Sequence, residues 1–254
     1  MASVENQSYY QLVINTCLLA GKIMVENGSD LQRVEDTIYR IGHNAKMKSI
    51  NAYITVTMIM VSSTDPNIPA QMINVNKRSF NLTKVVKVND LSRKFAAEQI
   101  NIETFYQQLQ LTDIQNDFFS LKMQVLGAIL VSGPLVVVFR DNVIDALPAC
   151  AVAAITWVFF YFMNRYFNIR FVSEFSSAFL LAGISALMVR IGWAHNMDDL
   201  IIGSVMPLLP GIPLTNAVRD LLAGNLVSGP ARGVEALISA CALGFGVAVG
   251  LHLF

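Results

Sequence analysis

The sequence predicts a membrane protein in which a small cytoplasmic α+β module, residues 1–120, is followed by an all-α bundle of five transmembrane helices, residues 121–254. Three observations support this fold class. Apolar residues make up 54% of the chain and charged residues only 14%, whereas an ordinary soluble domain carries about 25% charged residues. The mean hydropathy is +0.50. The charges are uneven, because residues 1–120 hold 11 Lys/Arg and 11 Asp/Glu and the longer remainder holds 7 and 7.

Composition also excludes several classes of protein. The formal net charge is zero, so a nucleic-acid-binding surface has no electrostatic support. The three cysteines, Cys17, Cys150 and Cys241, are too few and too scattered for a disulfide framework. The chain opens with the polar residues Glu5 and Asn6 rather than with a signal peptide. We therefore expect the first half of the chain to stay in the cytoplasm.

The second half contains five apolar segments, each close to the roughly 17–25 residues that cross a bilayer as a helix. They cover residues 123–139, 143–163, 173–191, 199–222 and 232–254. Five crossings place the chain ends on opposite sides, and the positive-inside rule then selects the orientation. With the N-terminus inside, the inner face collects Lys122, Arg165, Arg170, Arg219 and Arg232, and the outer face only Arg140 and Arg190. We expect a multi-pass protein of the inner membrane with its C-terminus outside.

The fourth segment is interrupted near its middle by Pro207, Pro210, Gly211 and Pro213. Each proline removes a backbone donor and crowds the carbonyl four residues earlier. One interpretation is a kinked helix whose freed carbonyls are satisfied by neighbouring hydroxyls or helices. Three prolines and a glycine favour the other interpretation, a discontinuous helix that lines an aqueous cavity, as in many transporters.

Polar residues cluster where this helix resumes, at Thr215, Asn216, Arg219 and Asp220. Asn216 and Asp220 are four residues apart and share one helical face. Polar groups within a bilayer usually mark a path for a substrate or ion. Arg219 and Asp220 could instead form a solvated pair at the inner interface. Thr215 and Asn216 lie closer to the break and are the better candidates for solute contact.

Other polar and small residues of the membrane half are less specific. We interpret the step at Ser132–Pro134 as a packing kink. Glu174 and Glu235 lie near the predicted inner face, where each is either a simple interfacial carboxylate or, if buried in a cavity, a proton carrier. Gly244, Gly246 and Gly250 in the last segment predict close helix packing.

The first half reads as alternating helices and strands. Residues 8–26 have amphipathic helical spacing and end at Gly28, and Ser29 with Gln32 forms a capping-box pattern for a second helix to Asn44. The alternating β-branched residues of 49–63 predict one strand and residues 70–76 a second. A helix follows over 81–97, with Leu82, Val85, Val86 and Leu91 facing inward, and a short helix begins after Asn101.

No pattern in the chain predicts an enzyme. The three histidines, His43, His195 and His252, fall in separate regions, and no zinc-ligand spacing, phosphate-binding loop or nucleophilic triad is present. We expect no catalytic residues, no metal and no cofactor. The cytoplasmic module could gate the membrane part, bind a regulator or touch the solute as it enters.

Two motifs resemble those of a known family. Gly28-Ser-Asp-Leu-Gln-Arg-Val-Glu-Asp36 is similar to the motif Gly-Ala-Glu-x-x-Arg-Val-Glu-Asp, with Ser29 and Asp30 in place of Ala-Glu. The segment from Pro210 to Arg232 resembles the signature of the fourth membrane helix, in which a proline-glycine break precedes Asn-x-x-Arg-Asp. By these motifs the chain resembles the threonine/serine exporter family from about residue 8 to its end.

The resemblance implies export of a small polar metabolite, coupled to the proton gradient. Named members export threonine and serine, and related two-subunit systems export a dicarboxylate such as succinate. Full-length members carry a second five-helix half, whereas this chain is similar to the N-terminal half alone. We therefore expect a partner, a second short membrane subunit, and leave open assembly with copies of itself.

The hypothesis drawn from the sequence is one subunit of a secondary exporter. Its substrate-binding residues are expected to be Pro210, Gly211, Thr215, Asn216 and Arg219. Arg219 would attract a carboxylate, Asp220 would balance Arg219 or take a proton, and Glu174 is a second candidate for coupling. The alternative is a membrane-anchored sensor or scaffold whose cytoplasmic module binds a ligand.

Overall fold

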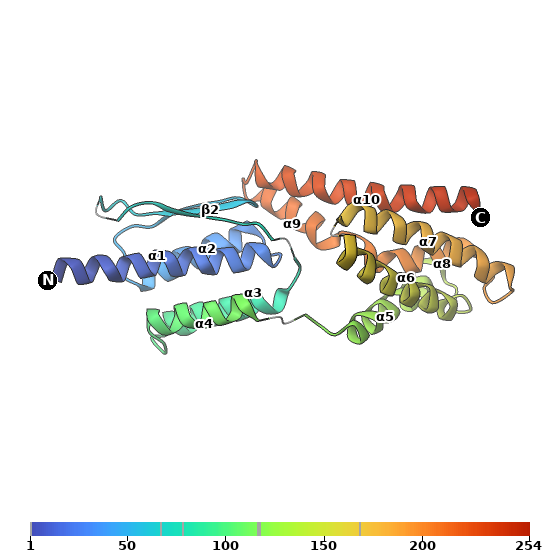
Figure 1. Cartoon of the computed structure of the whole chain (residues 1–254), viewed down its shortest axis with the longest axis horizontal. Coiled ribbons are helices and arrows are strands. Elements are labelled where there is room, and N and C mark those ends of the chain that lie inside the picture. The colour runs from blue at the N-terminus through green and yellow to red at the C-terminus, as the bar shows by residue number, and fades with distance from the viewer. Residues whose placement is uncertain (1, 67, 78, 116–117, 168) are drawn as a thin grey trace. The chain divides into compact units, whose positions relative to one another are not determined.

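The computed structural model describes residues 2–66, 68–77, 79–115, 118–167 and 169–254. The chain divides into two compact units (Figure 1). Unit 1 comprises Met1–Phe118 and Ile212–Gly233, and unit 2 comprises Phe119–Gly211 and Val234–Phe254. A segment of the apolar half, residues 212–233, is therefore part of the same compact unit as the polar half.

Unit 1 contains four helices of the polar half, a small sheet, and the segment that follows the break. The elements are α1 (Ala2–Glu26), α2 (Leu31–Asn44), β1 (Asn51–Ile54), β2 (Met58–Ser62), β3 (Gln71–Asn74), α3 (Leu82–Ala96), α4 (Ile102–Ile114), most of α9 (Gly211–Leu222) and the first turns of α10 (Ser228–Leu253). The predicted α+β character of the polar half is confirmed.

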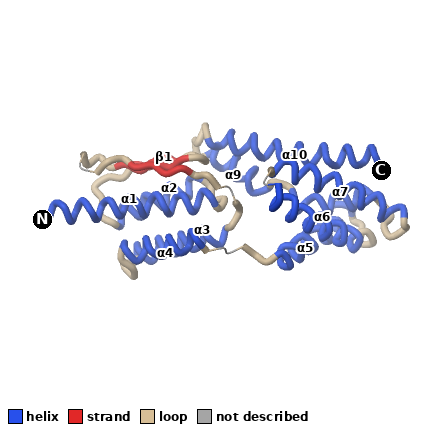
Figure 2. The backbone as a smooth tube through the Cα atoms, in the orientation of Figure 1, coloured by secondary structure: helices blue, strands red, loops and turns tan. Residues whose placement is uncertain are grey.

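The core of unit 1 is built around α1. The three-stranded antiparallel sheet, in the order β1-β2-β3, lies along one side of the α1–α2 pair, and α3 and α4 lie along the other (Figure 2). The largest fully buried side chains include Ile14, Ile23, Ile38, Ile59 and Phe105, one or more from each layer. Burying side chains of this size stabilises a small unit by about 1.5–3 kcal/mol each.

The prediction of one strand over residues 49–63 is wrong, because the structure has a hairpin there. β1 and β2 are antiparallel and joined by a tight turn, with Ile54 opposite Ile59. The Thr55 hydroxyl accepts the N–H of Met58 at 3.0 Å and donates to the Met58 carbonyl at 3.0 Å. A threonine side chain thus closes the turn without the glycine or asparagine that usually marks one.

Two further details of unit 1 differ from the prediction. Asp30, not Ser29, caps α2, since its carboxylate accepts the N–H of Arg33 at 3.0 Å. In α3 the inward face includes Val85 and Leu91 as expected, but Leu82 and Val86 are exposed. Buried polar residues take their places, among them Lys84, whose ammonium group donates to the carbonyl of Asp113 at 2.8 Å.

Unit 2 holds long apolar helices. They are α5 (Leu121–Arg140), α6 (Ala146–Phe167), α7 (Arg170–Arg190), α8 (Met197–Val205) with a 3-10 turn at Met206–Leu208, and the rest of α10. Among the described residues four helices, α5, α6, α7 and α10, are long and apolar enough to cross a membrane, or five spans if α8 and α9 together form one. The chain thus has the helices of a multi-pass membrane protein.

The helices of unit 2 pack through small and hydroxyl-bearing residues. α8 contacts α5, α6 and α7, and Ser132 of α5 and Ser204 of α8 both donate to the carbonyl of Ala149 in α6, at 3.1 and 3.0 Å. Such hydrogen bonds and close backbone approach hold helices together in lipid. Large apolar side chains such as Leu130 and Phe245 remain exposed on the outer faces, as lipid-facing residues are.

Glycines of α10 allow it to lie against α7, as predicted for Gly246 and Gly250. A Cβ atom at Gly250 would lie 2.5 Å from the Cβ of Ala182 and 3.1 Å from the carbonyl oxygen of Phe179. Gly244 has open space around it and takes no part in this contact. The sequence predicts a packing kink at Ser132–Pro134. In the structure α5 continues through these residues, with Pro134 inside the helix.

The fourth span is discontinuous, as the prolines predict. α8 ends at Val205, and Leu209 then adopts an extended conformation with φ −62° and ψ 138°. The residue before a proline avoids the helical region, so Pro210 accounts for this extension. Pro213 lies in the first turn of α9, where a missing N–H costs no intrahelical bond. The helix therefore breaks at Leu209–Pro210 and restarts at Gly211.

Candidate functional site

The candidate site of unit 1 starts from the α1–α2 loop, residues 27–30. At the end of α1 the N–H of Gly28 bonds the carbonyl of Val25 at 3.3 Å, and the N–H of Ser29 bonds that of Met24 at 3.0 Å. This is a Schellman motif, which needs a left-handed residue at its centre. Gly28 has φ +90°, and a Cβ atom there would lie 2.7 Å from Cδ1 of Phe80. Glycine is therefore required at position 28.

The N-terminus of α2 binds two carboxylates. Asp30 caps it from the helix's own chain, and the N–H of Leu31, the first residue of α2, donates to Oδ1 of Asp220 in α9 at 2.9 Å. The first N–H groups of a helix lack intrahelical partners and carry a partial positive charge, so they favour anions. Asp220 is fully buried and Asp30 is 6% exposed.

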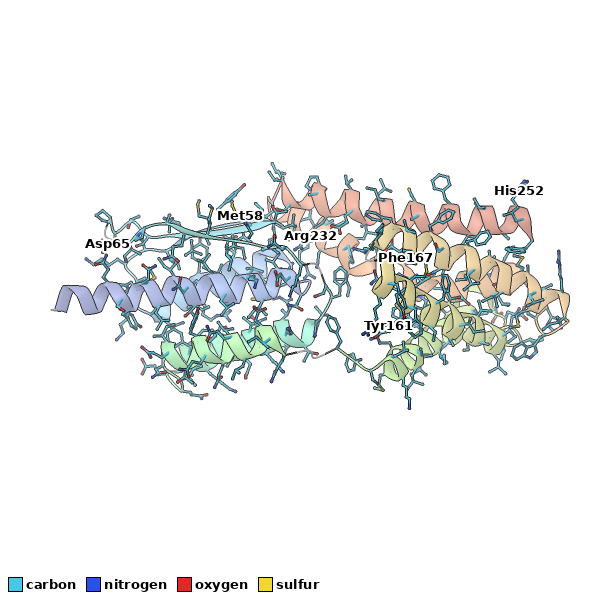
Figure 3. All side chains as sticks on the ribbon, in the orientation of Figure 1. Met58, Asp65, Tyr161, Phe167, Arg232 and His252 are labelled. Atoms are coloured by element: carbon cyan, nitrogen blue, oxygen red, sulfur yellow. The ribbon has the colours of Figure 1, made fainter. Side chains whose placement is uncertain are left out.

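Side chains of the C-terminal segment bind the carbonyl groups of the α1–α2 loop. The side-chain amide of Asn216 donates to the carbonyl of Gly28 at 2.8 Å. Arg232, labelled near the start of α10 in Figure 3, donates Nη1 to Oδ2 of Asp220 at 2.9 Å and Nη2 to the carbonyl of Ser29 at 3.0 Å. The Arg232 side chain is only 11% exposed, so this is a buried and hydrogen-bonded ion pair.

Arg219 lies at the edge of the same cluster. Its Nη1 donates to Oδ2 of Asp30 at 3.0 Å, and its side chain is 54% exposed. We call Asp30, Arg219, Asp220 and Arg232 the ion network; its two carboxylates and two guanidinium groups balance. Arg33, whose Nε lies 3.5 Å from the same carboxylate oxygen, is similarly exposed at 52%. Of the four members, Arg219 has the most exposed side chain.

The structure brings three of the residues predicted for substrate binding and coupling, Asn216, Arg219 and Asp220, into this one cluster. Their partners differ from those expected, because Asp220 pairs with Arg232 and Arg219 with Asp30. Asp220 is fully buried, which excludes the interpretation of a solvated Arg219–Asp220 pair.

The other predicted residues do not belong to the ion network. Thr215 is exposed, and its hydroxyl donates to the carbonyl of Ile212 at 3.0 Å. Pro210 and Gly211 form the break in the fourth span, at the end of the segment Phe119–Gly211 of unit 2. Glu174 belongs to a separate cluster in α7.

Sequence reasoning missed the roles of Asp30, Arg232 and the peptide groups of Gly28–Leu31. The signal was present, since these residues lie in the two motifs from Gly28 to Asp36 and from Pro210 to Arg232. What the motifs do not reveal is that they bind each other. Hydrogen bonds between residues 188 to 203 positions apart join them.

Unit 2 contains a second polar cluster, which joins α7 to α10. Arg170 donates Nε to Oε1 of Glu174 at 2.9 Å and Nη1 to Oε1 of Glu235 at 3.3 Å. The hydroxyl of Ser239 also donates to Oε1 of Glu174, at 3.1 Å. Two carboxylates thus share one guanidinium group.

A third cluster ties the loop between α5 and α6 to the start of α8. Asp199 binds Arg140 and also accepts the amide of Asn142 at 2.8 Å. Asp145 is fully buried and accepts the backbone N–H groups of His195 at 2.8 Å and Asn196 at 3.0 Å. Burial opposes ionisation of Asp145, but these bonds and one from Asn142 outweigh it and hold its pKa below the usual range.

We expect Asp145 to make the stability of unit 2 depend on pH. Because folding lowers the pKa of Asp145, its carboxylate contributes fully to the free energy of unfolding above the ordinary carboxyl pKa. This contribution is lost as pH falls through the lowered pKa. The melting temperature of the detergent-solubilised protein should therefore fall on acidification, and Asp145→Asn should be less stable than wild type at neutral pH and flatten this dependence. The control is Asp141→Asn, at an exposed left-handed position that asparagine adopts readily. An unchanged profile in Asp145→Asn would contradict the assignment.

The described residues contain no group of three or more His, Cys, Asp or Glu side chains placed to hold a metal ion. The cysteines are unpaired, and burial raises the pKa of the Cys17 thiol, which keeps it unreactive.

Long apolar helices, one of them interrupted, define a multi-pass membrane protein. Residues 15–254 match the sequence profile of a family described as "Putative threonine/serine exporter". The chain belongs to this family of threonine/serine exporters.

A curated relative supports the same class. The chain is 22% identical over 261 aligned positions to a protein of Klebsiella aerogenes named "Probable succinate transporter subunit YjjP", and the alignment covers 98% of this chain and 96% of the relative. No solved structure matches the chain. The family description and the name of the relative both point to a transporter.

Proposed function

We propose that this chain is one subunit of a secondary exporter for a small polar metabolite that carries a carboxylate, either threonine and serine or a dicarboxylate such as succinate. It lies in the inner membrane with its N-terminus in the cytoplasm and its C-terminus outside, and works with a second short membrane subunit. The proton gradient drives export. The family description supports the amino acids as substrates, and the name of the relative supports the dicarboxylate.

The observation that carries the proposal is the half-exposed guanidinium group of Arg219 beside a buried, charge-balanced network. Arginine binds carboxylates through two parallel hydrogen bonds. A solute carboxylate that reaches Arg219 takes the place of Asp30, whose other oxygen still caps α2 through the N–H of Arg33. Exchange of one carboxylate for the other thus gives Arg219 a way to hold and release the solute.

The remaining predicted residues complete the proposed site. Thr215 is an exposed residue one helical turn before Arg219, and its hydroxyl group donates to the carbonyl of Ile212. Asn216 holds the α1–α2 loop through a hydrogen bond to the carbonyl of Gly28. Pro210 and Gly211 interrupt the span. Asp220 holds Arg232 and the N-terminus of α2 in place. In this arrangement Arg219 and Thr215 touch the solute, and Asn216 and Asp220 position Arg219 through the shared helix.

The test is efflux of labelled threonine and labelled succinate from proteoliposomes that contain both subunits. A hydrogen bond to a charged group contributes about 1.5–3 kcal/mol, so Arg219→Ala should raise KM about 10- to 100-fold. Asp30→Asn keeps the helix cap and removes the competing charge. Because an exposed pair contributes about 0.2–1 kcal/mol, this change should lower KM about 1.5- to 5-fold.

Arg33→Ala is the matched control, because Arg33 is as exposed as Arg219 and approaches the same carboxylate from outside the C-terminal segment. It should leave KM within about twofold of wild type, since surface pairs contribute little. Equal effects of Arg33→Ala and Arg219→Ala, or no efflux of either solute by the wild-type pair, would overturn the proposal.

A further inference from the structure

The cluster of Arg170, Glu174, Glu235 and Ser239 lies within unit 2 on two helices that are apolar enough to span a membrane. Glu174 is 2% exposed, and one of its oxygens, Oε1, accepts from both Arg170 and Ser239. Its other oxygen, Oε2, is buried and has no hydrogen-bond partner in the described part of the chain. A buried carboxylate oxygen without a partner is costly and calls for a ligand.

Other buried carboxylates of the chain differ in this respect. Asp145 and Asp199 each have both oxygens hydrogen-bonded. Asp220, the other candidate for coupling, uses Oδ1 for the N–H of Leu31 and Oδ2 for Arg232. Protonation of Asp220 would break one of these bonds, whereas Oε2 of Glu174 can accept a proton while every bond to Oε1 stays in place.

The charge of the cluster also favours one bound proton. Glu174 and Glu235 both pair with the guanidinium group of Arg170, so these three side chains carry one net negative charge when both carboxyl groups are ionised. Ionised groups within a bilayer are costly unless they are paired. One proton on Glu174 makes the cluster neutral and leaves Arg170 paired with Glu235.

The charged and titratable groups of the neighbouring helices are engaged elsewhere or lie apart. Arg165 of α6 donates to the hydroxyl of Tyr161 at 3.2 Å. Asp199 of α8 binds Arg140, and Asp198 is exposed. On α10, Cys241 and His252 are exposed, and Figure 3 shows His252 at the far end of that helix from Arg232. In the described part of the chain, the charged group that contacts Glu174 is Arg170, which also pairs with Glu235.

We propose that Glu174, with Glu235, Arg170 and Ser239, is the proton-binding site that couples export to the proton gradient; this rests on the proposed exporter function. A proton from the outer side binds Oε2 of the Glu174 carboxylate and forms the neutral acid, while Arg170 keeps its ion pair with Glu235. Loss of that proton to the inner side restores the anion, which Arg170 and Ser239 stabilise again. The cycle moves one proton and breaks no other covalent bond.

The first experiment compares two modes of transport in proteoliposomes with both subunits. Net efflux driven by an imposed pH gradient needs proton binding and release, whereas exchange of labelled for unlabelled solute at equal pH does not. Glu174→Gln should lose at least tenfold in gradient-driven efflux and keep exchange within about threefold of wild type. Glu235→Gln should shift the pH dependence of efflux, because it removes the second carboxylate that pairs with Arg170 beside Glu174.

Ser239→Ala and Ser176→Ala form a matched pair. Ser239 donates to Glu174, whereas Ser176 is exposed and donates to the carbonyl of Val172 in its own helix. Only Ser239→Ala should shift the pH dependence of efflux. Gradient-driven efflux of wild-type size in Glu174→Gln would overturn the proposal. So would efflux that follows a sodium gradient at constant pH and is lost in Glu174→Gln, because the bound ion would then be sodium.

The second experiment measures protonation without transport. Infrared difference spectra of the same liposomes between alkaline and acidic buffer should show the carbonyl band of a buried carboxylic acid, and this band should vanish in Glu174→Gln but not in Asp90→Asn, at an exposed position. An unchanged band in Glu174→Gln would overturn the proton site. If the wild-type pair moves no solute in any mode but the Glu174 band is present, the proton site stands and the exporter function fails.

Discussion

Replacing Asp220 by alanine should destabilise unit 1 by about 3 kcal/mol, because it removes a carboxylate paired with the buried guanidinium group of Arg232 and, at the same time, an acceptor for the N-terminus of α2. Arg232 is 11% exposed, so water cannot replace the lost carboxylate. The N–H of Leu31 loses its acceptor as well. The measurement is the denaturation midpoint of the purified protein in detergent, followed by circular dichroism.

Two variants separate loss of the charge pair from a general effect of mutation. Asp198→Ala removes an exposed carboxylate and should change the free energy of unfolding by less than about 0.5 kcal/mol. Adding Arg232→Met to Asp220→Ala removes the buried charge that has lost its carboxylate partner and should recover part of the loss. A midpoint for Asp220→Ala equal to that of Asp198→Ala would contradict a structural role for the ion network.

The sequence was sufficient for features that depend on local chemistry. Pro207, Pro210 and Pro213 restrict their own backbone and that of the preceding residue, so the break follows from the local sequence. The end of α1 at Gly28 follows in the same way, because glycine readily adopts the left-handed backbone that ends a helix. The membrane spans follow from the length of the apolar segments. These predictions required no knowledge of distant residues.

The errors arise where two local signals compete. Ser29 and Asp30 are both good helix caps, but the Schellman motif uses Ser29 to close α1, so α2 begins one residue later at Asp30. The β1–β2 turn escaped notice because Thr55 closes it with a side chain typical of strands. In each case the backbone satisfies its hydrogen bonds with a residue that also suits another structure.

The ion network could not be predicted, because it depends on contacts between distant segments. Asp30 and Asp220 are close only because the α1–α2 loop meets α9, and no periodicity specifies that pairing. The unpartnered oxygen of Glu174 is likewise a property of packing, since the sequence shows a carboxylate near a helix end and nothing of its burial. Charges in the sequence indicate candidates, and only the fold identifies their partners.

Removing the break in the fourth span should abolish export while leaving the protein in the membrane. In the triple variant Pro207→Ala, Pro210→Ala and Pro213→Ala, each change favours helix by about 3 kcal/mol at an interior position, so one continuous helix is expected to form through Leu209. We expect efflux to fall at least tenfold, because a continuous helix removes the broken backbone that, in many transporters, faces the solute. Membrane insertion, measured by fractionation, should stay normal.

Pro134→Ala is the matched control for the loss of a proline from a span. Pro134 lies inside α5, which continues through it without a break, so its replacement should leave efflux near the wild-type level. A membrane-anchored sensor or scaffold would tolerate both sets of changes, because its helices serve only for assembly. Full efflux in the triple variant would therefore remove the broken span from the mechanism, whereas loss in that variant alone would favour the exporter over the scaffold.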